Sequence, residues 1–255
     1  MNILKSILIG LFIISLMGCK EEFDKVSVFN EYASFIEYSP HSKNIKRQII
    51  TYKENGIENQ VSIIKADEKG RVIYYSDKIN KMSLLNSIIS VDYEQLTFNY
   101  KAPFLGINVN NGNIFLDKTK SIQKMVGVTG GKYSMENHYN DGKLISTFWE
   151  SAFLSSKNEF YWENNSITKY ISEIKKLTGE SFISIESVIS YNSDGQLQGM
   201  KSSMTVMGMP MELIVTFQKI NNYGDWTEAE LVSSINSENS KEKKVETVTR
   251  EIEYW

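Results

Sequence analysis

The chain has very little cysteine, histidine and proline. Its 255 residues include 1 cysteine, Cys19, together with 2 histidines and 3 prolines. A lone cysteine cannot close an internal disulfide, so the folded part depends on its core for stability. Zinc sites of the usual kinds need cysteine and histidine at paired spacings, which the sequence lacks. A catalytic triad would have to use His41 or His138, and both stand beside expected turns, where we expect ordinary surface residues.

The chain also lacks a surplus of positive charge and a long apolar run. Its 28 basic and 31 acidic residues give a net charge of −3, which disfavours a nucleic-acid partner because phosphates need cationic contacts. The apolar stretch at residues 7–18 follows Lys5 and stops before the charges that begin at Lys20. It is shorter than the roughly 20 residues that a spanning helix needs. This layout predicts a secretory signal peptide over residues 1–18.

The only cysteine stands where that apolar stretch ends. The junction "LMGC", residues 16–19, resembles the lipobox of bacterial lipoproteins. The resemblance implies diacylglycerol on the Cys19 sulfur, cleavage before Cys19 and acylation of the new N-terminus. The alternative is a buried or free cysteine that lies there by chance. By analogy with lipoprotein sorting in Gram-negative bacteria, Lys20 after the cysteine favours the outer membrane over the inner one. We therefore expect a lipid-anchored envelope protein with a short tether, residues 19–28, and a single β-rich domain, residues 29–255.

What the sequence does contain is a repeated hairpin signal. Asn or Asp stands next to or near glycine between strand-like runs, as in "TYKENGIEN" and "HYNDGKLISTF". Such pairs tolerate the positive φ that tight hairpin turns require. The expected turn glycines are Gly56, Gly70, Gly112, Gly142, Gly195 and Gly224. The pattern predicts a mainly β fold, an antiparallel meander of consecutive hairpins that forms a curved sheet or partial barrel, with one or two short helices.

Two segments are the candidates for these helices. In "ITKYISEIKKL" the apolar residues Ile167, Tyr170, Ile171, Ile174 and Leu177 follow helical spacing. A weaker candidate runs over residues 117–126. The C-terminal "VETVTREIEYW" alternates apolar and polar residues and predicts a final strand.

Two blocks at the ends of the folded part resemble a known family. The stretch "FNEYASFIEYSPHSKNIKRQIITYKENG" resembles the start of YnfC-like lipoproteins of enteric bacteria, and "NNYGDWTEAEL…VETVTREIEYW" is similar to their ending. The ending also resembles the Tyr-Asp repeats of Rhs-like β proteins. The resemblance implies a lipid-anchored envelope protein, and Cys19 is the only functional residue that it carries over.

Methionines crowd one segment, from Met200 to Met211. On an extended strand Met207, Met209 and Met211 would share a face, and clustered thioethers suit Cu(I). The ordinary interpretation, which we favour, is that adaptable methionines fill a core or line an apolar groove. Pro210 would interrupt the ladder there and indicates an edge strand or bulge.

The aromatic run "EFYWEN", with Trp149 nearby, could stack on sugar rings of an envelope glycan. Alternation places Phe160 and Trp162 on one face and Tyr161 on the other. Acidic residues are plentiful, and nothing in the sequence selects two of them as a working acid/base pair. The acids considered are Glu136, Asp141, Glu150, Glu159 and Glu163.

These patterns favour a protein that is not an enzyme and that needs no cofactor. We expect a lipid-anchored envelope lipoprotein whose β-sheet surface engages an envelope protein or glycan. The alternative is a carrier of a small ligand, Cu(I) or lipid-like, that uses the Met200–Met211 segment. An envelope hydrolase is a third class, which would need acids converging in a cleft.

The lipid anchor has a direct test. Replacing Cys19→Ser removes the sulfur that would form the thioether, so acyl labelling and membrane retention should both be lost. Metabolic labelling with a fatty acid, followed by membrane fractionation, measures this. Continued labelling of the Cys19→Ser protein would show that the junction has been misread.

Overall fold

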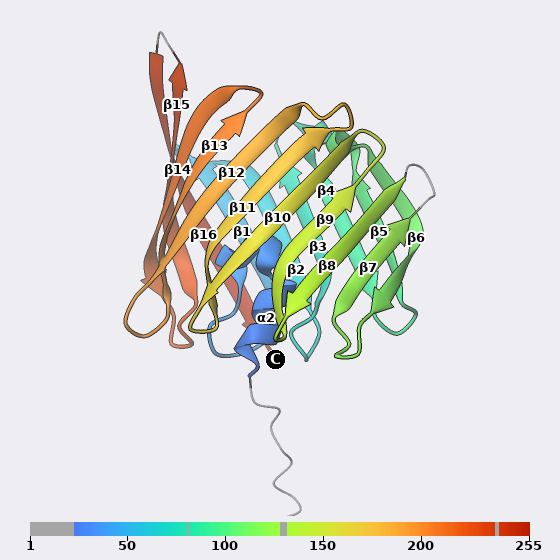
Figure 1. Cartoon of the computed structure of the whole chain (residues 1–255). Coiled ribbons are helices and arrows are strands. Elements are labelled where there is room, and N and C mark those ends of the chain that lie inside the picture. Colours follow the sequence, from blue (N-terminus) through green and yellow to red (C-terminus); the bar gives the residue numbers. More distant parts are fainter. Residues whose placement is uncertain (1–22, 81, 128–131, 238–239) are drawn as a thin grey trace, which may run out of the picture.

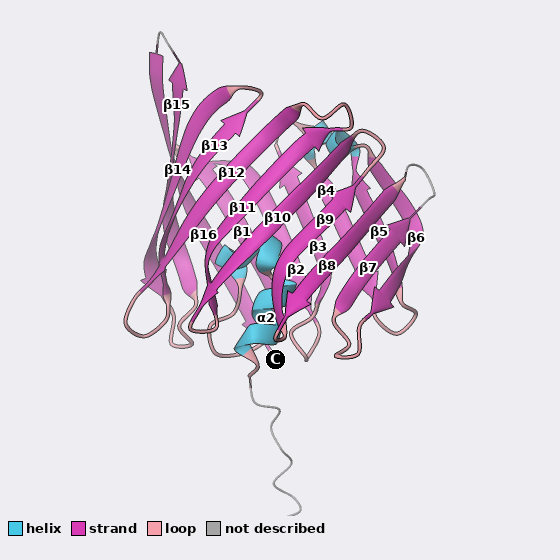
Figure 2. Ribbon diagram, viewed as in Figure 1, coloured by secondary structure: helices cyan, strands magenta, loops and turns pink. Residues whose placement is uncertain are grey.

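The sheet closes into a barrel. The computed structural model describes residues 23–80, 82–127, 132–237 and 240–255, and in these residues sixteen antiparallel strands follow one another around the barrel until β16 pairs with β1 (Figures 1 and 2). The meander of hairpins is therefore confirmed, and the sheet is more complete than the partial barrel that the sequence predicted. The strands are β1 Ile45–Glu54, β2 Ile57–Ala66, β3 Val72–Ile79, β4 Ser87–Asp92, β5 Thr97–Ala102, β6 Ile107–Leu116, β7 Ile122–Gly127, β8 Tyr133–Asn140, β9 Lys143–Glu150, β10 Leu154–Glu163, β11 Ser166–Lys176, β12 Ser181–Tyr191, β13 Leu197–Val206, β14 Met209–Ile220, β15 Trp226–Ser237 and β16 Ser240–Tyr254.

The hairpin turns use the expected chemistry with one exception. Asn55 and Gly56 join β1 to β2 with φ of 50° and 77°, the left-handed pair that a two-residue hairpin needs. Gly112 was expected at a turn and lies instead inside β6. A Cβ atom there would lie 2.3 Å from the Phe98 ring, so the glycine permits close packing of β6 on β5 rather than a turn.

Both predicted helices are strands. Residues 167–176 belong to β11 and residues 122–126 belong to β7. A register shift between Tyr161 and Trp162 leaves an extra residue in β11 just after Ile167, and it breaks the strict alternation of its apolar residues. The apolar spacing therefore imitates a helix where the chain is a bulged strand. β7 has a comparable register shift next to Ile122, and it disturbs the alternation of the apolar residues there in the same way.

The short helices lie at the N-terminus, inside the barrel. α2 (Lys25–Glu31) and the 3₁₀ helix η1 (Ala33–Tyr38) enter from one end of the barrel (Figure 1). Asp24 caps α2 by accepting hydrogen bonds from the backbone N–H groups of Val26 and Ser27, each at 3.1 Å. We call α2 and η1 together the plug. Residues 25–28, which were expected as part of a tether, are thus the first turn of this plug. Short 3₁₀ helices η2 (Ser83–Leu85) and η3 (Pro103–Leu105) lie in connections at the opposite end.

The plug is held by a buried arginine from the last strand. Nη2 of Arg250 donates to the carbonyl of Tyr38 at 2.8 Å, and its Nε donates to Oε1 of Gln48 at 2.7 Å. Gln48 in turn donates to the same Tyr38 carbonyl at 3.1 Å. The guanidinium lies 5.1 Å from the ring of Trp226 and donates to the Trp226 carbonyl at 3.4 Å. This buried cation is therefore satisfied by neutral acceptors and an aromatic face.

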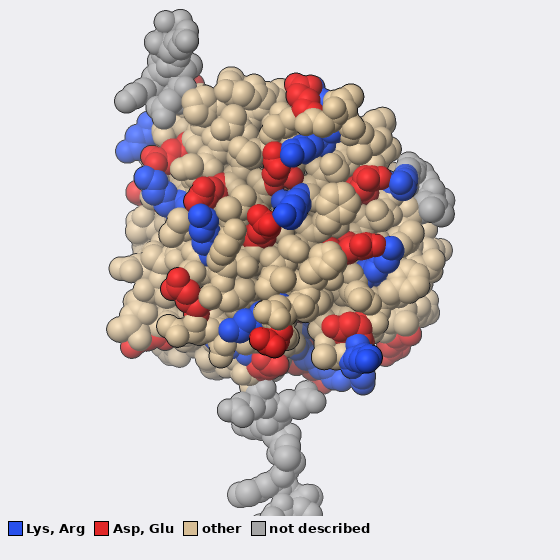
Figure 3. Space-filling model, viewed as in Figure 1, with Lys and Arg blue, Asp and Glu red and all other residues tan. Residues whose placement is uncertain are grey.

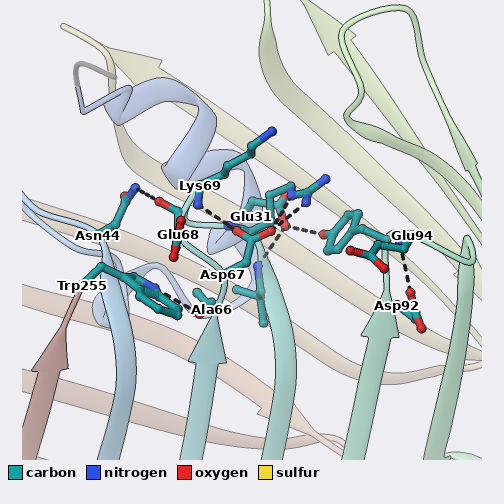
Figure 4. Close-up of polar contacts among 12 residues, drawn as sticks. Glu31, Asn44, Ala66, Asp67, Glu68, Lys69, Asp92, Glu94 and Trp255 are labelled. Carbon is teal, nitrogen blue, oxygen red and sulfur yellow. Dashed lines mark hydrogen bonds and ion pairs between the residues drawn. The ribbon is translucent and has the colours of Figure 1, made fainter. Parts of the chain in front are cut away.

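A second polar cluster fixes the end of α2 to two hairpin connections (Figure 4). The Glu31 carboxyl accepts from the hydroxyl of Tyr93 at 2.9 Å. Arg71 lies 4.1 Å from the Tyr93 ring and pairs with Asp67 at 2.7 Å. Because Tyr93 follows β4 and Arg71 precedes β3, the cluster ties the plug to two neighbouring turns. A third tie comes from Asn30, which bonds both Gly142 and Leu144 in the β8–β9 hairpin.

The outer wall carries charges of both signs (Figure 3). Many of them pair across or along the strands, including Lys169 with Glu186 at 2.6 Å and Lys201 with Glu212 at 2.7 Å. The same wall also exposes apolar side chains, including Phe115, Phe148 and Val188, so charged and apolar groups are mixed on it. No helix in the described ranges is both long and apolar enough to cross a membrane.

The buried arginine has a measurable role in stability. Replacing Arg250→Met should lower the free energy of unfolding by about 2–4 kcal/mol, because the acceptors of Tyr38 and Gln48 lose their donor. Arg47→Met, at an exposed position on the adjacent strand, is the matched control and should cost no more than about 0.5 kcal/mol. Chemical denaturation of both variants measures this. Equal stability of the two variants would show that the plug is held by other contacts.

Candidate functional site: a cavity above the N-terminal plug

The plug fills one end of the barrel and leaves a cavity at the other. Sixteen-stranded barrels are wide enough to hold a water-filled channel. Here η1 forms the bottom of a cavity of about 530 Å³, and strands β1 to β5 and β8 to β12 form its sides. We call the plugged end the floor. We call the opposite end the rim. It is formed by the connections that follow the odd-numbered strands, such as β1–β2, β3–β4 and β5–β6. Leu105, in the β5–β6 connection, lines the cavity, which places the mouth at the rim.

Nine aromatic side chains line the cavity. Phe35 of the plug stacks on Tyr75 with ring centroids 5.3 Å apart, and Tyr100 meets Tyr133 edge to face at 5.3 Å. Hydroxyl and amide groups of Ser156, Asn158 and other inward residues are interspersed among the rings. The aromatic lining consists of Phe35, Tyr38, Tyr52, Tyr75, Tyr100, Tyr133, Trp149, Phe160 and Tyr170.

Glu37 supplies the one carboxyl group among the described residues that line this cavity. Burial raises its pKa to about 7, and the charge of Arg250 opposes that rise. Within the described part of the chain, no other side chain forms a hydrogen bond with the Glu37 carboxyl. The nearby Asp77 is different, because it accepts from Gln60 at 2.8 Å and from Ser62 at 2.7 Å.

The tyrosines around Glu37 are neutral at ordinary pH. Burial, with the Glu37 charge as a smaller contribution, raises the pKa of Tyr170 to about 12. Burial also raises the pKa of Tyr52 and Tyr75, with the Glu37 charge again contributing. The hydroxyls of Tyr38 and Tyr52 are hydrogen-bonded to each other. The cavity therefore combines neutral rings and hydroxyls with one titratable acid.

A smaller apolar cavity adjoins the first. Its volume is about 80 Å³, and Glu37, Tyr38 and Tyr52 line both spaces. Its other walls are apolar residues from β13 to β16, including Met200, Phe217 and others of the main core. Glu37 thus lies where the larger cavity meets a smaller, apolar one.

The rim exposes apolar side chains on several separate connections. Phe153, between β9 and β10, is 67% exposed and lies over Gly106, and Leu84 in η2 is 71% exposed. Phe104 of η3 contacts Phe182 with ring centroids 5.9 Å apart. The exposed apolar residues of the rim are Ile57, Met82, Leu84, Phe104, Phe153, Leu177, Met207 and Met209.

The methionine segment forms one hairpin of this rim. Met207 lies in the turn with a φ of 49°, and Met209 begins β14, so the three proposed copper ligands do not share one strand face. Met207 and Met209 are exposed, Met211 is half-buried, and Met200 packs in the core. Pro210 pairs with Thr205 of β13, and the ladder to β15 starts only at Met211, which fits the expected interruption. A copper site here stays a prediction.

The other residues considered from the sequence are placed as follows. Phe160 is buried, Trp162 packs on the core and Tyr161 is exposed, so their predicted alternation is confirmed. His138 is exposed on β8, whereas His41 is half-buried against Gly224 in the floor. Burial lowers the pKa of His41. Cys19 and the signal segment lie outside the described residues.

The acids considered from the sequence do not meet in a cleft. Glu136, Glu150 and Glu159 form ion pairs with Lys124, Lys132 and Lys157 on the outer wall. The described residues contain no group of three His, Cys, Asp or Glu side chains placed to bind a metal. Sequence reasoning missed Glu37, because its segment carries no motif that marks a site.

One comparison with a solved structure bears on the fold. No protein-family model matches the chain, and no curated protein matches it. A porin-like protein from Bacteroides uniformis superposes with a TM-score of 0.51 at 10% identity, covering 82% of this chain and 98% of that chain. A porin-like protein from Bacteroides vulgatus gives a TM-score of 0.39 at 9% identity over 84% and 99% of the two chains. Kievitone hydratase from Nectria haematococca gives 0.23 at 8% identity over 94% and 95%. The first likeness shows a shared fold, and the other two superpose too loosely to carry an argument.

The two buried acids predict how stability depends on pH. Glu37 and Glu31 each have a pKa raised from 4.5 to about 7 by burial. Between pH 4.5 and about 7 the folded state therefore binds more protons than the unfolded state. The free energy of unfolding should fall as the pH rises from 4.5 through 7. At about 1.36 kcal/mol per pKa unit, the ceiling is about 3 kcal/mol for each group.

The variant Glu37→Gln should flatten this pH dependence by the share that Glu37 contributes, and it should be more stable than the natural chain at pH 8. Glu159→Gln, on the outer wall, should leave the slope unchanged. Urea unfolding at pH 5, 6, 7 and 8 measures both. A Glu37→Gln curve parallel to that of the natural chain would show that Glu37 titrates normally.

Proposed function

We propose that this chain is a lipid-anchored protein of the bacterial cell envelope that holds a small, largely apolar ligand inside its barrel and catalyses no reaction. The observation that carries the proposal is the aromatic cavity above the plug. Its volume of about 530 Å³ lies within the range of about 300–1,000 Å³ typical of small-molecule sites. Rings that make up its walls offer large apolar contact area with little conformational freedom to lose.

The plug supports a carrier rather than a channel. Core contacts and the Arg250 network hold α2 and η1 in the barrel, and the cavity ends on η1. A ligand that enters at the rim therefore reaches a closed end, which η1 forms. The exposed apolar residues around the mouth suit a ligand that leaves a lipid or apolar surface, because they lower the cost of its passage through water.

The proposed anchor gives the cavity a direction. α2, which begins at Lys25, lies at the floor end of the barrel (Figure 1). An extended chain spans at most about 3.5 Å per residue, so six residues could separate Cys19 from the start of α2 by about 21 Å at most. Lipid on Cys19 would then hold the floor toward its own membrane and turn the mouth away from it. The resemblance to YnfC-like lipoproteins remains part of this proposal.

A second candidate is contact with an envelope partner, and the rim favours it over the wall. Ion pairs on the wall satisfy their own charges, whereas Phe153, Leu84 and Ile57 are each more than half exposed on the rim. A partner that binds these tips would cover the mouth of the cavity. We therefore expect such a partner to donate or receive the ligand.

Ligand binding is tested by filling the cavity. Ser172 lines it from β11, and the next residue, Glu173, points to the outer wall and pairs with Lys175. Ser172→Trp should weaken binding of the neutral dye N-phenyl-1-naphthylamine by about tenfold or more, because the indole takes the space of the dye. Glu173→Trp is the matched control and should change the affinity by less than about twofold. Fluorescence titration of the full mature chain measures both. Equal affinity for both variants would show that the dye does not use the cavity.

A further inference from the structure

We propose that the ligand is an amphipathic organic amine, with its ammonium group at Glu37 and its apolar body among the aromatic rings. This inference rests on the proposed function and names the chemical class of the ligand. Three observations on the described residues lead to it: no other residue partners the acid, no basic side chain lines the walls, and the rings around the acid are suited to a cation.

Glu37 is an acid inside the barrel that no other described residue partners, since its carboxyl accepts only from its own backbone N–H. A buried carboxylate is normally paired or hydrogen-bonded, because an isolated one is costly. The described residues follow this rule elsewhere: Glu31 accepts from Tyr93, Asp225 accepts from Tyr254 at 2.6 Å and Asp77 accepts from Gln60 and Ser62. Glu37 departs from the rule and faces the cavity of about 530 Å³. The cationic group of a ligand would supply the partner that no other described residue provides.

The walls contain no competing cation. Neither cavity has Lys, Arg or His among its described lining residues. Arg250 is the nearest buried cation, and its donors go to Gln48, to the Tyr38 carbonyl and to the Trp226 carbonyl. The charge inside the cavity is thus negative when Glu37 is ionised. An anionic ligand would be repelled, and a fatty acid is therefore a poor candidate for this site.

The surrounding rings suit a cation. An ammonium group gains about 0.5–2 kcal/mol over the face of an aromatic ring, and more when water is excluded. Tyr38 and Tyr52 line both cavities beside Glu37, and Phe35 precedes it in the plug. A charge-assisted hydrogen bond to the carboxylate adds orientation as well as affinity. The small apolar cavity behind Glu37 could take a short alkyl group on the same nitrogen.

The test compares three ligands that differ only in their polar group: phenylbutylamine, phenylbutanol and phenylbutyrate. Isothermal titration of the full mature chain at pH 8 should show the amine binding about tenfold tighter than the alcohol, which corresponds to one charge-assisted contact. The carboxylate should bind more weakly than the alcohol. In Glu37→Gln the affinity for the amine should fall to within about twofold of that for the alcohol, while the affinity for the alcohol stays the same.

Two further variants keep the result interpretable. Glu37→Asp retains the charge and should retain a preference for the amine, and Glu159→Gln on the outer wall should bind all three ligands as the natural chain does. Unchanged alcohol binding in Glu37→Gln shows that the cavity is intact, so a lost amine preference is not a folding defect.

The outcomes separate the inference from the proposed function. Alcohol and amine binding with equal affinity would overturn the assignment to amines and leave the carrier standing. A preference for the amine that survives Glu37→Gln would overturn the role of Glu37. If none of the three ligands and no neutral dye bound, the carrier itself would be refuted.

A pH series provides an independent readout. The amine's advantage over the alcohol should shrink as the pH falls below 7, since protonation of Glu37 removes the charge that the ammonium group contacts. The other charged or titratable groups that face Glu37 are Arg250, Tyr38, Tyr52, Tyr75 and Tyr170. None of these tyrosines titrates between pH 5 and 8, because burial raises the pKa of each. An advantage that is constant from pH 5 to 8 would contradict an ionic contact at Glu37.

Discussion

The architecture depends on the contact between Arg250 and the carbonyl of Tyr38. A closed barrel of this width has too few inward side chains to fill its own interior, and the N-terminal segment supplies the missing volume. The segment is short, so its position has to be fixed by specific bonds. Arg250 and Gln48 provide them at the end of η1, and Glu31 and Asn30 provide them along α2. Everything above η1, including the cavity and the placement of Glu37, follows from where this segment stops.

The outer wall and the interior of the barrel each combine polar and apolar side chains. Lipid-facing walls are apolar and pore linings are polar in membrane barrels. Here ion pairs such as Lys169 with Glu186 lie outside, and rings such as Tyr100 and Tyr133 lie inside. Apolar side chains such as Phe148 and Val188 are also exposed outside, and polar side chains such as Asn158 also line the interior. The likeness to a porin-like protein shows a shared fold.

Local chemistry made the hairpins predictable, and long-range contacts decided the rest. Asn55 and Gly56 indicate a turn because both residues tolerate the positive φ that a tight hairpin requires. Closure of the sheet depends on β1 meeting β16 from the other end of the chain, which no local pattern reports. The predicted helix at residues 167–177 failed because the bulge after Ile167 changes the apolar spacing. Gly112 failed as a turn because its function is to accept the Phe98 ring.

The candidate site was hidden for the same reason. Glu37 stands among Phe35, Ile36 and Tyr38 in a stretch that looks like an ordinary entrance to a domain. Its chemistry arises only when the barrel closes around it and removes water. The methionine segment attracted attention because its composition is unusual, yet the structure places Met207 and Met209 at an exposed hairpin tip. Composition identifies unusual stretches, whereas a buried unpaired acid can be identified only in three dimensions.

The most direct test of a ligand-holding barrel is native mass spectrometry of the full chain purified gently from the cells that make it. The natural chain should carry an additional small organic mass that disappears on denaturation, and Ser172→Trp should carry none, because its cavity is filled. A natural chain that shows only its own mass, or the same added mass on both chains, would contradict a ligand inside the barrel.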